Sequence, residues 1–101
     1  MNINFTSGLI RSLALYLDIA LSDIAKEPEF PHTRITLYKM CDNKAPVNIK
    51  VNKFFNDFWN KRGLTPDDLQ NIYQLQDLVL EGSMKEREYR LKRHKEGLHN
   101  G

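Results

Sequence analysis

Basic and short polar side chains gather in the middle of this 101-residue chain, and their types suit contacts with phosphates and base edges. Residues 30–62 carry seven lysines and arginines against two acidic residues, a balance of +5 in a chain of net charge +2. Arg34 can donate two hydrogen bonds to guanine, and His32 and Thr33 can reach neighbouring base edges or phosphates. This pattern indicates a nucleic-acid-binding face, while a solvated basic surface without a partner would have the same composition.

The flanking segments differ in charge from this basic region. Residues 1–29 balance −2, and residues 63–82 contain four acidic residues and no basic one. Residues 83–101 balance +3. We expect residues 1–82 to form one domain and residues 83–101 to form a basic helical or partly disordered extension, which either contacts phosphates or only keeps the chain in solution.

Helical periodicity and capping residues predict an all-α fold, a compact bundle of four to five helices that contains a helix-turn-helix. The aromatic stripe Phe54, Phe55, Phe58 and Trp59 is typical of a core helix, and Gly63 ends it. No strand pattern or internal repeat is present. The predicted helices run over about 7–18, 21–27, 31–41, 47–62 and 65–81, followed by a polar segment over 83–96.

Residues 20–44 read as two short helices joined by a tight turn. Ile24 and Ala25 should face inward from the first helix, and Ile35 and Tyr38 should attach the second helix to the core. With these residues inward, the polar residues of the second helix face outward. The second helix of such a unit can then enter the DNA major groove. The alternative is a helical hairpin that only builds the core.

The apolar residues of this unit follow a defined spacing: Ile24-Ala25, then Phe30, then Ile35-Thr36 and Tyr38-Lys39. The spacing resembles the lambda-repressor-like helix-turn-helix family, of the Cro/C1 or XRE-like type. Family members have an apolar-alanine pair, three residues, glycine, an apolar residue, Ser or Thr, three variable residues and Ile-Ser. The chain has Glu29 in place of the glycine and Pro31 in place of the hydroxyl residue. The resemblance covers residues 9 to about 80 and implies a sequence-specific DNA-binding regulator, of the phage or prophage repressor type.

This interpretation gives a role to the exposed polar residues of the unit and of the segment after it. The base-reading residues are His32, Thr33, Arg34 and Thr36. The residues that hold the DNA backbone are Ser22, Lys39, Lys44, Lys50 and Lys53. The partner is double-stranded DNA with an inverted-repeat operator, bound by a homodimer. The 65–81 helix carries more apolar residues than one small core can bury. The predicted dimer interface therefore contains Leu75, Leu78 and Val79.

A protein-binding module is the competing interpretation. A small inhibitor or adaptor could keep the helix-turn-helix fold and bind a host protein through exposed Leu37, Met40 and the wide face of the 65–81 helix. Salt dependence and sequence selectivity of DNA binding separate the two interpretations.

Catalytic, metal-binding and membrane functions lack support in the sequence. The three histidines have no i, i+4 partner for a metal, and there is no phosphate-binding glycine loop or nucleophile elbow. We therefore expect no enzyme, metal, cofactor or small-molecule ligand. The amino terminus lacks a signal-peptide pattern, and no apolar run approaches the ~20 residues that cross a bilayer. The single Cys41 fits a reducing compartment, so a cytoplasmic protein is expected.

Overall fold

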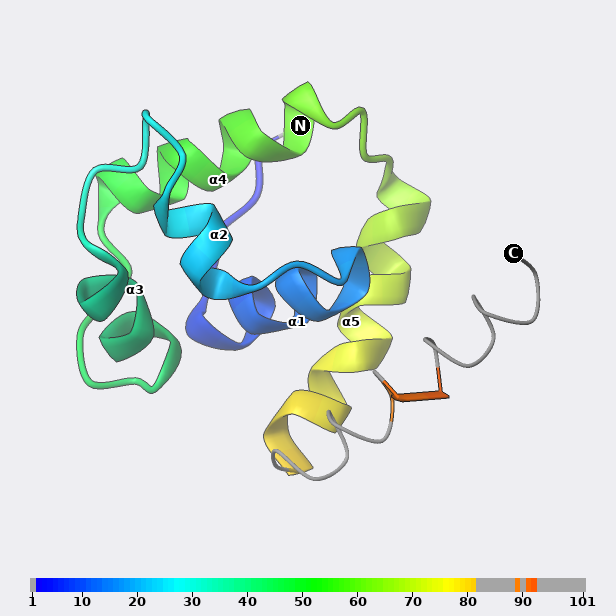
Figure 1. The fold of residues 1–101 in the computed structure, drawn as a ribbon. Helices are drawn as coiled ribbons and strands as arrows, with labels where there is room; N and C mark the ends of the chain where they lie inside the picture. Colours follow the sequence, from blue (N-terminus) through cyan, green and yellow to red (C-terminus); the bar gives the residue numbers. More distant parts are fainter. Residues whose placement is uncertain (1, 82–88, 90, 93–101) are drawn as a thin grey trace.

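The computed structural model describes residues 2–81, 89, 91 and 92, and five helices lie within residues 2–81. The helices are α1 (Ser7–Leu17), α2 (Leu21–Ala25), α3 (Arg34–Cys41), α4 (Ile49–Lys61) and α5 (Pro66–Glu81). Figure 1 shows α3 at one end of the molecule and α5 at the other, with α1 and α2 between them. The described residues contain no strand, which confirms the all-α prediction.

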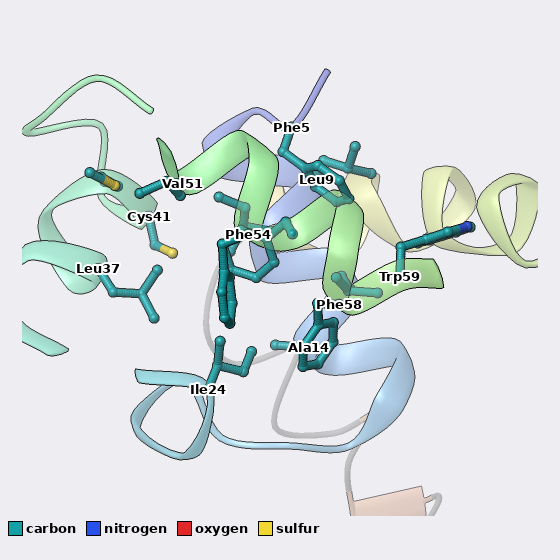
Figure 2. Close-up of a cluster of buried hydrophobic side chains, with 14 of the residues drawn as sticks. Phe5, Leu9, Ala14, Ile24, Leu37, Cys41, Val51, Phe54, Phe58 and Trp59 are labelled. Atoms are coloured by element: carbon teal, nitrogen blue, oxygen red, sulfur yellow. The ribbon is translucent and has the colours of Figure 1, made fainter. Parts of the chain in front are cut away.

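The core forms around the aromatic face of α4. Phe55 and Trp59 are fully buried, and Phe54 and Phe58 nearly so, as the stripe predicted. Phe30 meets the ring of Phe54 edge to face at 5.1 Å between centroids. Figure 2 shows side chains from α1, α2, α3 and α4 converging on this cluster. The helix ends before Gly63, whose φ of 65° allows the chain to turn away.

An extended segment at residues 3–5 lies against α4, and this packing was not predicted. Ile3 and Phe5 are buried. The Ile3 N–H donates to Asn56 Oδ1 at 2.7 Å, and Asn56 Nδ2 donates back to the Ile3 carbonyl at 2.8 Å. The Phe5 N–H donates to Asn52 Oδ1 at 2.7 Å. Two asparagines one turn apart thus bind the segment's backbone as a neighbouring strand would. We call Asn52 and Asn56 the asparagine clamp.

Helices α1 and α5 pack side by side in antiparallel directions. Gly8 lies beside Gln76, so closely that a Cβ at Gly8 would come within 2.8 Å of the Gln76 side chain. Near the other end, the Tyr16 hydroxyl donates to Asp68 Oδ1 at 2.7 Å. Leu75, one of the predicted dimer residues, is half-buried. The side chains of Leu78 and Val79, and most of the 83–101 extension, lie outside the described residues.

The start of α5 has the capping pattern that Thr65-Pro66-Asp67-Asp68 predicted. The Thr65 N–H and hydroxyl both donate to Asp68 Oδ2, and the Asp68 N–H donates to Thr65 Oγ1. This reciprocal pairing satisfies backbone donors that the first turn of a helix otherwise leaves free. The Thr65 backbone N–H, followed by the Tyr16 and Thr65 hydroxyls, lowers the pKa of Asp68 from its usual 3.8.

The lowered pKa of Asp68 gives a defined pH dependence of stability. A carboxyl whose pKa falls on folding stabilises the native state above its unfolded pKa, and that contribution disappears as the pH drops through the folded pKa. Asp68→Asn should therefore be less stable than the parent near neutral pH, and the gap should close in acid. Thermal melts of both proteins across that range measure it. A gap that does not change with pH would contradict the assignment, and Asp67→Asn is the neighbouring control.

Candidate nucleic-acid interface

The connection between α2 and α3 is longer than a helix-turn-helix turn. The two helices are separated by the eight residues 26–33, whereas such a motif uses three or four. The tight turn predicted here is therefore wrong. Pro28 and Pro31 disfavour helix at the residues before them, and Phe30 is buried against α4, so the connection follows the core surface.

Helix α3 begins three residues later than predicted. Thr33 is its N-cap, and the Thr33 hydroxyl accepts a hydrogen bond from the Thr36 N–H at 3.3 Å. Pro31 lies outside the helix. The helix also ends as the sequence indicated, because Asn43 follows it with a φ of 58°, the left-handed conformation that asparagine tolerates.

The face of α3 that meets the core is the opposite of the predicted one. Leu37, Met40 and Cys41 are buried, and Figure 2 shows Leu37 and Cys41 in the core cluster beside Val51. Ile35 is 60% exposed and Tyr38 39% exposed. The prediction that these two residues attach the helix to the core is wrong. The protein-binding alternative predicted that Leu37 and Met40 are exposed, and that prediction is wrong too.

Four residues form the surface that α3 presents to solvent, which we call the α3 outer face: Arg34, Ile35, Tyr38 and Lys39. They are spaced at i, i+1, i+4 and i+5, so they lie on one side of the helix. Within the described part of the chain, neither Arg34 nor Lys39 forms an ion pair. The two cations flank an isoleucine and a tyrosine, an arrangement able to contact both charged and apolar groups.

The other predicted base-reading residues are occupied inside the chain. Thr33 and Thr36 form the cap, with their hydroxyls 3.3 Å apart. The Asn48 Oδ1 accepts from the Val51 N–H, which leaves Asn48 Nδ2 to donate to His32 Nε2 at 2.8 Å. This contact joins the start of α3 to the start of α4. Among the four predicted residues, only Arg34 has its polar atoms unengaged by the described residues.

The predicted backbone-contacting residues separate into two groups. Lys39 and Lys44 are exposed at the end of α3, where the Lys44 N–H donates to the Lys39 carbonyl at 2.7 Å. Lys50 and Lys53 lie on α4, and Lys53 pairs with Asp57 at 3.1 Å. Ser22 is half-buried in the first turn of α2. The roles of all five residues at DNA stay predictions.

A groove of about 410 Å³ lies between the 26–33 connection and α4, and no sequence pattern indicated it. Phe54, Phe58 and Pro31 line its apolar part. Some of its charged residues are engaged within the chain: Lys61 bonds Glu29 at 3.3 Å, and the Arg62 guanidinium stacks 4.2 Å from the Phe58 ring centre. The remaining lining residues are Glu27, Lys50, Lys53 and Asp57. With four basic and three acidic residues, the groove presents charges of both signs to a ligand.

Cys41 and the possible metal ligands are the remaining groups with chemistry of their own. Burial raises the pKa of the Cys41 thiol to about 12, so it stays protonated and unreactive at neutral pH. No three His, Cys, Asp or Glu residues of the described part come together as metal ligands. Its helices are also too short or too polar to cross a bilayer.

Comparison of the chain with protein-family models, with curated proteins and with solved structures finds no match in any of the three.

Proposed function

We propose that this chain is a sequence-specific DNA-binding regulator that inserts α3 into the major groove. The observation that carries the proposal is the α3 outer face, which combines two cations, unpaired within the described residues, with exposed apolar side chains on one side of an end-positioned helix. The major groove of B-DNA admits an α-helix, and its base edges offer hydrogen-bond acceptors next to methyl groups. Arg34 is suited to guanine, and Lys39 and Lys44 to phosphates.

The position of α3 supports the resemblance to repressor-type helix-turn-helix proteins in a changed register. Those proteins have a hydroxyl residue four positions before a buried apolar residue. The family spacing placed this pair at Pro31 and Ile35, but the chain has it at Thr33, the N-cap, and Leu37, which is fully buried. The pair therefore lies two residues later than the family spacing placed it, and the outward positions shift with it. The outward residues become Ile35 and Tyr38 in addition to Arg34 and Lys39.

The binding mode in this proposal is that of a homodimer on an inverted repeat. A single short helix reaches few base pairs, so a second copy is needed for useful affinity, with reading helices separated by one or more whole DNA turns. The apolar side of α5 around Leu75 is the proposed dimer surface, and binding at such a site would act on transcription by position.

Selection from a random duplex library, followed by binding measurements over a range of salt concentrations, tests the proposal. We expect an enriched inverted repeat and an affinity that falls with salt. Lys44→Gln should weaken all sequences alike and reduce the slope of log affinity against log salt by about one. Lys61→Gln, whose lysine pairs with Glu29 at the far end of α4, should leave the slope unchanged. No enriched sequence, with affinity equal on every duplex, would refute the proposal and leave a protein partner as the explanation of the exposed face.

A further inference from the structure

Ile35 is an exposed apolar side chain that does not contribute to the core. It is 60% exposed in the first turn of α3, and the helix is attached through its other side, by Leu37, Met40 and Cys41. A β-branched residue is also a weaker helix former than the lysine or glutamate that a solvated position allows. Neither the core nor the local structure therefore accounts for isoleucine here.

The surroundings of Ile35 restrict what it could contact in a complex. Arg34 precedes it, Lys39 lies one turn further along the same side, and Tyr38 is exposed beside it. A purely apolar partner would have to bury Arg34 and Lys39 without compensating charges, which is costly. A fitting partner presents negative charge or acceptors around a small apolar group. The major groove does so, because the C5-methyl of a pyrimidine lies among base acceptors and between phosphates.

We infer that Ile35 determines specificity by packing against a pyrimidine C5-methyl group in the major groove. The inference rests on the proposed DNA-binding function and names a chemical group that this function would recognise. In unmodified DNA the methyl belongs to thymine, and 5-methylcytosine carries the same group. Isoleucine suits the contact because its branched χ1 is restricted before binding, so little side-chain entropy is lost. With Arg34 on guanine, the methyl belongs to a neighbouring base pair.

Single replacements of thymine by deoxyuridine in the selected duplex test the inference, because each removes one methyl and leaves every hydrogen-bonding group in place. One position should weaken binding about fivefold, which is about 1 kcal/mol at 1.4 kcal/mol per factor of ten. Ile35→Ala should weaken binding to the thymine duplex and abolish the difference between thymine and deoxyuridine at that position.

Ile49→Ala is the matched control, because Ile49 is 88% exposed in the first turn of α4 and is not one of the four residues of the α3 outer face. This variant should keep the parent's discrimination between thymine and deoxyuridine. Melting temperatures of both variants should equal or slightly exceed the parent's, since neither side chain is in the core and alanine is the better helix former.

The two sources of the methyl group are separated by methylating cytosines of the same duplex one at a time. Thymine is the source if a deoxyuridine replacement weakens binding, and 5-methylcytosine is the source if only cytosine methylation strengthens it, in each case with loss of the effect in Ile35→Ala. Selective DNA binding that ignores both changes would overturn the inference and leave the proposed function standing. An absence of any sequence-selective binding would overturn both.

Discussion

Asn56→Ala is expected to lower the free energy of unfolding by about 2–4 kcal/mol. Asn56 is buried, and its side chain bonds both the N–H and the carbonyl of Ile3, with a further bond from Nδ2 to the Asn52 carbonyl. Alanine would leave two buried backbone groups without partners, at about 1–3 kcal/mol each. Either that penalty is retained, or residues 3–5 detach and expose Ile3 and Phe5 to water.

Denaturant unfolding followed by Trp59 fluorescence measures this loss, since Trp59 is the chain's only tryptophan and is fully buried. Asn60→Ala is the matched control, because Asn60 lies one turn further along α4 and is exposed. It should be neutral or slightly stabilising, as alanine is the better helix former. A smaller dependence on denaturant in Asn56→Ala would indicate detachment of residues 3–5. Equal stabilities of the two variants would refute the role assigned to the clamp.

Arg34→Ala is expected to cost about 1–3 kcal/mol of binding free energy on the selected DNA site and to relax selectivity at one base pair. Arg34 is the exposed cation in the first turn of α3, next to the N-cap. Replacement by alanine would remove both hydrogen bonds of a bidentate contact with guanine. Affinities for the selected duplex and for its single-base variants at one salt concentration measure both effects.

Arg62→Ala removes the same charge elsewhere and separates specific from general effects. The Arg62 guanidinium stacks on Phe58 at the end of α4, far along the chain from the α3 outer face. This control should retain the selectivity of the parent. Arg34→Ala with unchanged affinity and an unchanged preferred sequence would mean that α3 does not enter the groove by its first turn.

The helices with strong local signals are well predicted by the sequence. Thr6 caps α1, Thr65 and Asp68 cap α5, and α4 carries its aromatic residues on a single side, so capping and periodicity agree at each. Under such agreement, the local preference and the global fold favour the same residue range. Ile24 of α2 also faces the core as expected.

The α3 region was mispredicted because its local signals conflict. Both Pro31 and Thr33 are good starting residues, and a helix of only eight residues has apolar side chains on two sides. One side has Ile35 and Tyr38, and the other has Leu37, Met40 and Cys41. Packing against α1 and α2 decides between them, and those contacts are not a local property. The candidate site was therefore located in the right segment, with Arg34 and Lys39 outward, but its apolar half was missed.

The asparagine clamp escapes prediction for a related reason. Asn52 and Asn56 read as polar residues on a helix, and only the fold brings residues 3–5 against them. A hydrogen-bonded pair 53 positions apart leaves no periodic signal in the sequence.

The separation in sequence also indicates when the clamp forms during folding. Closing so long a loop costs chain entropy before any contact compensates for it, so the Ile3–Asn56 bonds should form after α4 has packed. Interactions absent from the folding transition state affect mainly the rate of unfolding. The clamp would therefore govern how long a folded molecule lasts, while the speed of folding is set by the helices.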